Sequence, residues 1–147
     1  MTGASRESAA AEIAALIEAW SRAVEAKNAE AMVAAYTPET VLFEMVPPAR
    51  IDGAEAIAAM WRQVLPMFPE IRRSEHRGLE ITVDGDLAFV HGLHRFRTDP
   101  PEHPVGQGWK RVTACYRRID GAWRVLHEHV SLPFDPQSGR VAPITEV

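Results

Sequence analysis

The stretch RRIDGAWRVLHEHVSLP, residues 117–133, carries the most specific structural signal in the chain. It contains an Asp-Gly pair, Asp120-Gly121, between two runs of alternating apolar and polar residues. Such a pair between alternating runs is typical of a two-residue β-hairpin turn. The sequence therefore predicts a hairpin that joins a strand over residues 109–118 to a strand over residues 123–132.

This hairpin assigns each side chain to a face of the sheet, because successive residues of a strand point to opposite sides. With Ile119 opposite Ala122, one face carries Arg111, Thr113, Cys115 and Arg117 together with Arg124, Leu126, Glu128 and Val130. The other face carries Val112, Ala114, Tyr116 and Arg118 together with Trp123, Val125, His127, His129 and Ser131. Glu128 and the two histidines beside it therefore point to opposite sides, unless a β-bulge changes the register locally.

The two histidines raise the question of a metal site. His127 and His129 share a face, and a pair at this spacing can bind zinc, which needs a third protein ligand. His91 and His94 are candidates for that ligand, but nothing in their spacing requires it. Histidines in folded proteins more often pack or form hydrogen bonds. We therefore expect no metal here, and structural or interface roles for His127 and His129.

Upstream of the hairpin, the hydrophobic period is first helical and then strand-like. A helical stripe runs through residues 8–26, and Asn28 is a suitable cap for a shorter second helix that reaches Tyr36. The other expected elements are a strand at 40–46, a helix from a capping box at Asp52–Glu55 to about Pro66, a hairpin of 79–83 with 87–96, and a loop at 99–108. We predict an α+β fold in which three N-terminal helices pack on a strongly curved antiparallel sheet.

Composition narrows the class of protein. The chain has 147 residues, 46% hydrophobic and 24% charged, which fits a single domain over residues 1–147 with a tail at 134–147. The net charge of −4 disfavours nucleic acid as a partner, and no apolar run reaches the roughly 18 residues of a membrane span. The first residues do not follow the pattern of a signal peptide, and the single cysteine, Cys115, excludes an internal disulfide. We expect a cytoplasmic protein.

Several segments together resemble a known family. They are the helix around Trp20, AKNAEAM at 26–32, IDGAEAI at 51–57, GDLAFVHG at 85–92 and the hairpin at 117–133. They are similar to the SnoaL-like branch of the nuclear-transport-factor-2-like superfamily over about residues 9–133. The resemblance implies a cone-shaped roll that encloses a deep pocket. Members include ketosteroid isomerase, polyketide cyclases, small hydrolases and the association domain of calcium/calmodulin-dependent kinase, so the reaction stays open.

The resemblance also indicates pocket residues. The pocket arginines of the kinase association domain fall on His94, Thr113 and Val130, its pocket glutamate on Glu18 and its pocket tyrosine on Met32. Because Thr113 and Val130 share a predicted face with Glu128 and Arg111, the last two become pocket candidates as well. His127 and His129 then lie on the outer face, which is the dimer interface of many family members.

The resemblance to ketosteroid isomerase implies further positions. Its base falls on Glu44, whose apolar surroundings would raise the carboxyl pKa and suit it to proton abstraction. Its oxyanion-hole tyrosine falls on Trp20 and its acid on or near Cys115, and neither residue supplies the same donor. Steroid isomerisation by that mechanism is therefore not expected. His94 is the second catalytic candidate, with a packed histidine and a solvated glutamate as the alternatives.

These positions define the expected site. Glu44 and His94 are the catalytic candidates, and the ligand-binding candidates are Trp20, Met32, Tyr36, Trp61, Arg111, Thr113, Glu128 and Val130. We expect a protein that binds an apolar or polycyclic small molecule and, as an enzyme, isomerises, cyclises or hydrolyses it by proton transfer without a cofactor. The alternative is a non-catalytic ligand-binding or association dimer.

The predicted hairpin also indicates an oligomer. Tyr116, Trp123, Val125 and His127 would form an apolar patch on its outer face. We therefore expect a homodimer that covers this patch.

Overall fold

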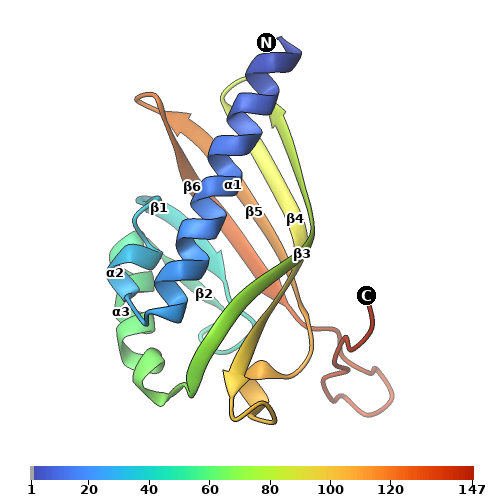
Figure 1. The fold of residues 1–147 in the computed structure, drawn as a ribbon. Helices are drawn as coiled ribbons and strands as arrows, with labels where there is room; N and C mark the ends of the chain where they lie inside the picture. Colours follow the sequence, from blue (N-terminus) through green and yellow to red (C-terminus); the bar gives the residue numbers. More distant parts are fainter. Residues whose placement is uncertain (1) are drawn as a thin grey trace.

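A computed structural model describes residues 2–147, which form an α+β roll (Figure 1). Its helices are α1 (Gly3–Glu25), α2 (Ala29–Met32) and α3 (Ala54–Val64), with the 3-10 turns η1 (Leu65–Met67) and η2 (Pro104–Gly106). Its strands are β1 (Tyr36–Phe43), β2 (Arg50–Asp52), β3 (Glu70–Asp84), β4 (Leu87–Asp99), β5 (Lys110–Ile119) and β6 (Ala122–Ser131). The predicted fold class, helices packed on a curved sheet, is confirmed.

The sheet is six-stranded and mixed, with the strand order β2-β1-β6-β5-β4-β3. All neighbouring strands are antiparallel except β1 and β6, which run parallel. The prediction of a wholly antiparallel sheet is therefore wrong at this pair. Parallel neighbours need a long connection, and most of the chain lies between β1 and β6, so no local sequence pattern reveals their pairing.

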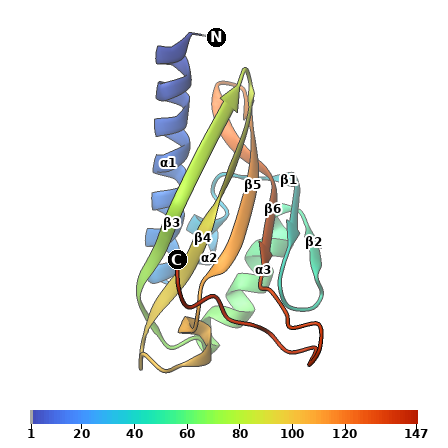
Figure 2. The ribbon, with the colours of Figure 1, turned by 90° about the vertical axis from the view of Figure 1, so that its right-hand side faces the viewer.

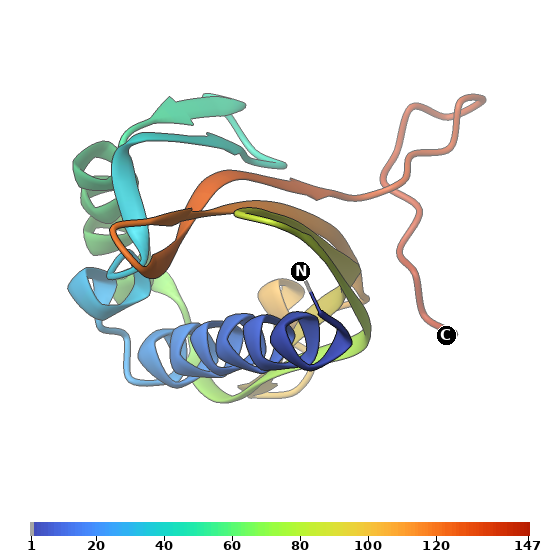
Figure 3. The same cartoon turned by 90° about the horizontal axis from the view of Figure 1, so that it is seen from above.

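The sheet curves around α1 without closing into a barrel, as the view from above shows (Figure 3). An apolar stripe of α1 that includes Ala9 and Ile13 packs in one buried cluster with Val90, Tyr116 and Trp123 of the sheet. Ile13 is fully buried, and burial of one such side chain stabilises a fold by about 1.5–3 kcal/mol. Packing of α1 on the concave face therefore forms the main core layer.

Turn chemistry fixes the last hairpin. Asp120 and Gly121 have positive φ values of 51° and 81°, and the strands pair from Ile119 and Ala122 outward. Positive φ at both central residues is the turn geometry that Asp-Gly favours, so the predicted two-residue turn is confirmed. The turn of the β3–β4 hairpin is residues 85–86, within the segment 84–86 that separates the two predicted strands.

Helix α3 begins after Gly53, and the predicted capping box is wrong. No side chain caps this helix, because Asp52 is paired instead with Arg50 at 2.9 Å. Gly53 has a φ of 90°, and a Cβ atom on it would lie 3.1 Å from the carbonyl oxygen of Pro38. Only glycine adopts this conformation readily, so backbone geometry rather than a side-chain cap fixes the start of α3.

Several elements also differ from the prediction. Helix α2 ends at Met32, and Tyr36 begins β1 instead of ending the helix. Strand β3 begins at Glu70 rather than at residue 79, and the short strand β2 was not predicted. The first half of β3 lies at the sheet edge and carries charged side chains, as edge strands often do, so it lacks the alternation that marks a strand in a sequence.

A β-bulge in β6 decides which side chains face inward. The pairing of β5 with β6 shifts between Cys115 and Tyr116, and Leu126 is left as an extra residue. Beyond one extra residue in a strand, each side chain of that strand lies on the face opposite to the one that simple alternation predicts. Glu128 therefore pairs with Ala114 and shares its face, contrary to the unbulged register that the sequence predicted.

The segment after β6 is irregular. Two isolated β-bridges, Phe134 with Val141 and Trp109 with Ile144, hold it, and it runs outside the roll (Figure 2). None of the helices described in residues 2–147 has both the length and the apolar character needed to cross a membrane.

Candidate functional site

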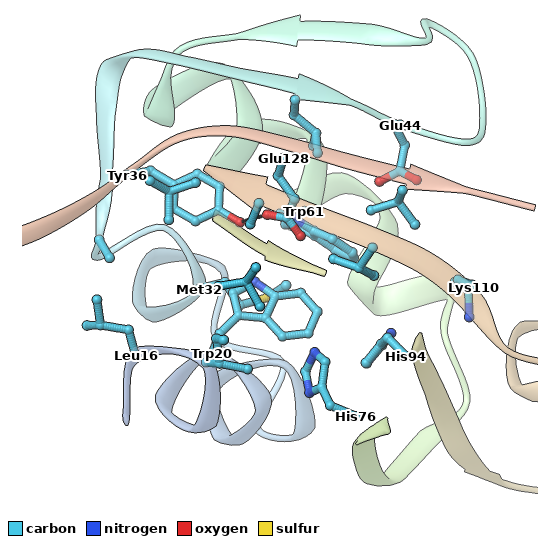
Figure 4. A pocket seen from close by; sticks show the side chains of 18 of the residues that line it. Leu16, Trp20, Met32, Tyr36, Glu44, Trp61, His76, His94, Lys110 and Glu128 are labelled. Atoms are coloured by element: carbon cyan, nitrogen blue, oxygen red, sulfur yellow. Dashed lines mark hydrogen bonds between the residues drawn. The ribbon is translucent and has the colours of Figure 1, made fainter. Parts of the chain in front are cut away.

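A cavity of about 390 Å³ lies between the helices and the concave face of the sheet, within the size range of small-molecule sites. Its walls are mostly apolar, and its polar side chains include Trp20, Tyr36, Glu44, His76, His94, Lys110, Tyr116, Arg124 and Glu128. The carboxyl groups of Glu44 and Glu128 lie on one side and the imidazoles of His76 and His94 on the other (Figure 4).

Glu128 lies at the centre of the carboxyl side. The hydroxyl of Tyr36, at the start of β1, donates a hydrogen bond to Glu128 Oε2. Burial raises the pKa of Glu128 to about 7, with a contribution in the same direction from the charge of Glu44, while the Tyr36 bond acts to lower it. Burial and the Glu128 charge also raise the pKa values of Tyr36 and Tyr116. Glu128 is therefore a carboxyl group that titrates near neutral pH, whereas the phenols of Tyr36 and Tyr116 do not titrate there.

Glu44 is the second carboxyl group of this side and follows the end of β1. Burial raises its pKa, against the lowering effect of a hydrogen bond from the backbone N–H of Met45 and of the charge of Lys110. The Met45 nitrogen lies 2.8 Å from Glu44 Oε1. The sequence-based expectation of a raised carboxyl pKa at this position therefore agrees with the structure.

Lys110, the first residue of β5, lies between the two sides. Its side chain is buried with the residue only 5% exposed, and Nζ lies 4.8 Å from the centre of the Phe96 ring. Among residues 2–147 the amine has no hydrogen-bond partner. Burial lowers its pKa to about 8, against the raising effect of the Glu44 charge.

The imidazole side is a hydrogen-bonded network. His94 Nε2 lies 2.8 Å from Ser74 Oγ, and Ser74 Oγ lies 3.1 Å from Ser21 Oγ. Ser21 Oγ is in turn 3.4 Å from His76 Nδ1. Burial lowers the pKa of His76 to about 4 and that of His94 well below its usual value. Both imidazoles are therefore neutral at neutral pH.

Trp20 of α1 closes the cavity on the helix side. Its ring packs edge-on against the rings of Trp61 and His94, with centroids 6.4 and 5.4 Å away. Its indole N–H is buried and has no hydrogen-bond partner within the described residues. A buried donor without a partner is costly to the fold, so this N–H is a natural point of attachment for a polar atom of a ligand.

The structure places most of the predicted site residues around this cavity. They are Trp20, Met32, Tyr36, Glu44, Trp61, His94, Glu128 and Val130. Arg111 and Thr113 do not line the cavity and lie exposed on the outer face. Because of the bulge at Leu126, the inner face of β5 is formed by the residues that alternate with these two along the strand. Glu18 is also exposed and pairs with Arg22 of its own helix, so its predicted pocket position is wrong.

Sequence reasoning missed four polar residues of the cavity. Arg124 was assigned to the inward face but not named as a site residue, and the other three are His76, Lys110 and Tyr116. Lys110 and Tyr116 share the period-2 face of β5 that was assigned outward. His76 pairs with His94 across β3 and β4, but its strand was predicted to begin only after it. The bulge and the charged edge strand therefore explain why the sequence pattern did not place these three residues in the cavity.

His127 and His129 lie outside the cavity. His127 Nδ1 is 2.7 Å from the carbonyl oxygen of Val41, and the Phe43 ring packs edge-on against both imidazoles. Within residues 2–147 no three His, Cys, Asp or Glu side chains gather as a metal site requires. These two histidines therefore make structural contacts on the outer face of the sheet.

The predicted apolar patch on that outer face is wrong in its composition. Tyr116, Trp123 and Val125 are 5%, 3% and 4% exposed and belong to the core under α1. The bulge again accounts for the difference. The exposed apolar residues that accompany His127 and His129 on the outer face are Phe43, Leu87 and Phe89.

Comparison with solved structures agrees with this geometry. An NTF2-like protein of unknown function from Pseudomonas putida is 30% identical, with a TM-score of 0.87 over 96% of this chain and 98% of that one. A putative dehydratase of the NTF2-like family from Streptomyces avermitilis is 18% identical, with a TM-score of 0.70 over 86% and 97% of the two chains. A putative calcium/calmodulin-dependent protein kinase II association domain from Xanthomonas campestris is 22% identical, with a TM-score of 0.67 over 92% and 88%.

Sequence comparison defines the family. No curated protein sequence matches the chain. The sequence model of the SnoaL-like domain matches residues 13–135, a span that holds all six strands and nearly every polar residue of the cavity. The chain therefore belongs to the family of SnoaL-like domains, within the NTF2-like superfamily.

Proposed function

We propose that this protein binds a small, largely apolar molecule in its cavity and catalyses a proton transfer on it without a cofactor, as in isomerisation, cyclisation or hydrolysis. The observation that carries this proposal is the environment of Glu128: a part-buried carboxyl group in the cavity wall, bonded to Tyr36, whose pKa is raised by burial to about 7. A general acid or base works best when its pKa lies near the working pH. The apolar walls supply the binding energy for the rest of the ligand.

In this mechanism Glu128 exchanges a proton with the substrate. Tyr36 holds the carboxyl group through Oε2, so the carboxylate that accepts a proton is oriented before the substrate arrives. Positioned acid–base catalysis of this kind contributes about 10²–10⁴-fold in rate. Glu44, which also has a raised pKa, is the second carboxyl group able to donate or accept a proton on the same wall.

The other candidates have orienting roles. The free indole N–H of Trp20 donates a hydrogen bond to the polar atom of the substrate. His94 is neutral and already bonded to Ser74, so we propose that it positions or polarises the substrate rather than carrying a proton to it. Met32, Trp61 and Val130 form apolar contacts with the ligand.

Hydrogen exchange in a model ketone tests this proposal directly. The probe is 2-tetralone, a bicyclic ketone whose α-protons exchange in D₂O, and the loss of their NMR signal reports the rate. We expect the protein to accelerate exchange and Glu128→Gln to slow it by about 100-fold. The control is Glu39→Gln, the same change at an exposed residue of β1. Equal acceleration by the wild type and Glu128→Gln would overturn the role of Glu128.

A non-catalytic ligand-binding protein is the second candidate. It is favoured by the internal pairing of the polar groups, because Glu128 and His94 each already bond a neighbouring residue. A binding protein would retain a small molecule, visible as extra mass in native mass spectrometry, and would leave the exchange rate of 2-tetralone at the buffer value.

We also propose that the protein is a homodimer. Phe43 and Phe89 remain 37% and 45% exposed on the outer sheet face, and apolar side chains grouped on one face favour association. Sedimentation velocity at micromolar concentration tests this, and a monomer would contradict it. Glu replacing Phe89 should weaken a dimer formed through this face.

A further inference from the structure

Lysine is rare in this chain and one of its two lysines is buried. Of the 16 lysine and arginine residues only Lys27 and Lys110 are lysines. Lys27 is exposed, and its Nζ donates a hydrogen bond to the carbonyl oxygen of Phe68 at 2.7 Å. Lys110 lines the cavity, is 5% exposed, and has no hydrogen-bond partner among residues 2–147. The two amines therefore differ in exposure and in hydrogen bonding.

The surroundings of Lys110 favour a neutral amine. No carboxylate within the described residues lies within 4 Å of Nζ, and an unpaired buried ammonium is strongly disfavoured. Its pKa of about 8 means that a large share of the amine is unprotonated under mildly basic conditions. Arginine would stay protonated at this position, whereas a desolvated lysine becomes a nucleophile.

We propose that Lys110 is a nucleophilic amine that forms an imine with an aldehyde or ketone group of the cavity ligand. Lys110 lines the cavity, and the reaction requires rotation about the outer bonds of its stem to bring Nζ to the carbonyl carbon of the ligand. The inference deepens the proposed function and rests on it for the ligand: the polar group of the apolar molecule is a carbonyl.

The step balances with groups that line the cavity. The nitrogen lone pair attacks the carbonyl carbon, and the carbonyl oxygen becomes the hydroxyl of a carbinolamine. The carbon–oxygen bond then breaks and water leaves, while both hydrogens of the amine depart with the oxygen. Glu44, whose charge is coupled to that of Lys110 and which lines the same cavity, is the carboxyl group that we assign to donate a proton to the leaving hydroxyl and to receive one from nitrogen.

Reductive trapping tests the proposal. The probe is 2-naphthaldehyde, which has no α-proton, with sodium cyanoborohydride to reduce any imine to a stable secondary amine. The expected product is a protein heavier by the aldehyde less one oxygen atom. Peptide mapping separates Lys110 from Lys27 and from the amino terminus. We expect Lys110 to be labelled at least tenfold faster than Lys27 at pH 8, although Lys27 is the exposed residue.

Variants separate a specific imine from incidental labelling. Lys27→Arg should label as the wild type does, and Lys110→Arg should lose the fast label while it retains a positive charge. Binding of 2-naphthol, followed by its fluorescence, shows that each variant keeps a folded cavity. Labelling of Lys27 as fast as Lys110, or fast labelling that survives in Lys110→Arg, would overturn the proposal.

Failure of this inference is distinguishable from failure of the proposed function. If 2-tetralone exchange depends on Glu128 but Lys110 is not trapped, the proposal of proton transfer is supported and the proposal of an imine is wrong. If Lys110 is trapped but the exchange of 2-tetralone is independent of Glu128, the proposal of an imine is supported and the acid–base role of Glu128 is wrong. If 2-naphthol does not bind and neither reaction occurs, both fall together.

Discussion

The two sides of the cavity respond to burial in opposite ways. On the side of β1 and β6, burial raises the pKa values of Glu44 and Glu128 toward neutrality. On the side of α1, β3 and β4, burial lowers the pKa values of His76 and His94. Burial disfavours the charged form of any group, so one cause raises the carboxyl pKa values, that of Glu128 to about 7, and keeps both imidazoles neutral near pH 7. Proton exchange is therefore expected on the carboxyl side, and fixed hydrogen bonding on the imidazole side.

The largest expected effect is the pH-dependent stability that Glu128 supplies. Its folded pKa of about 7 lies above its ordinary value of 4.5. Protonation therefore stabilises the fold, fully below about pH 4.5, and this contribution is lost as the pH rises through 7. It is on the order of 3 kcal/mol. Urea unfolding of the wild type and Glu128→Gln between pH 4.5 and 8 should show the wild type losing stability relative to the variant.

The acid titration of His76 affects both of those proteins equally and cancels in their difference. Parallel stability curves for the wild type and Glu128→Gln across this window would show that Glu128 is not a buried carboxyl group with a raised pKa.

The next effect concerns the imidazole side. Ser74→Ala removes the hydroxyl that lies 2.8 Å from His94 Nε2 and 3.1 Å from Ser21 Oγ. A buried polar group left without its partner costs about 1–3 kcal/mol of unfolding free energy. We expect that loss of stability by urea unfolding together with an unchanged pH dependence of 2-tetralone exchange. A shift of the pH profile in Ser74→Ala would place proton transfer on the imidazole side as well.

A moderate effect is expected from Tyr36→Phe, which tests how the carboxyl side controls proton exchange. The hydrogen bond from Tyr36 lowers the pKa of Glu128, so its removal should raise that pKa further. The pH at half-maximal exchange of 2-tetralone should move upward, and the maximal rate should fall by roughly tenfold as the carboxylate loses its orientation. A downward shift would contradict this pairing.

The smallest effect is expected on the outer face. Thr113 is exposed on β5, although the resemblance to the kinase association domain assigned it to the pocket. Thr113→Val should change stability by no more than about 0.5 kcal/mol and leave 2-tetralone exchange unaltered. Ala114→Thr, one position along the strand and on the cavity face, is the matched change and should impair binding of 2-naphthol. Equal effects of the two substitutions would contradict the bulge at Leu126.

Local chemistry explains which parts of the molecule could be predicted. The turn at Asp120-Gly121 and the apolar stripe around Ile13 follow from patterns within one element, and both were found. The parallel contact of β1 with β6 joins distant segments, and no pattern within either strand specifies it. The fold class was predictable because the helical and strand periods are strong over most of the chain.

The site was predictable only in part, for a similar reason. Glu44 was identified because its position matches the base of ketosteroid isomerase in the family resemblance. Glu128 was identified because it shared a predicted face with Thr113 and Val130, although the bulge places Thr113 on the opposite face from Glu128. Lys110 was missed because one inserted residue, Leu126, reverses the faces of β5 relative to β6, and an alternating pattern does not reveal an insertion. The reactivity that we propose for Lys110 depends on burial and on the absence of a partner, which only the three-dimensional structure describes.

Direct titration of Glu128 is the measurement closest to the central claim. Carbon-detected NMR of the side-chain carboxyl groups, with Glu128→Gln used to assign the signal, gives its pKa in the folded protein. We predict a pKa near 7, well above the ordinary value of 4.5 for this carboxyl group. A titration midpoint near 4.5 would show that Glu128 is an ordinary solvated carboxylate and would contradict the account of the cavity as an acid–base site.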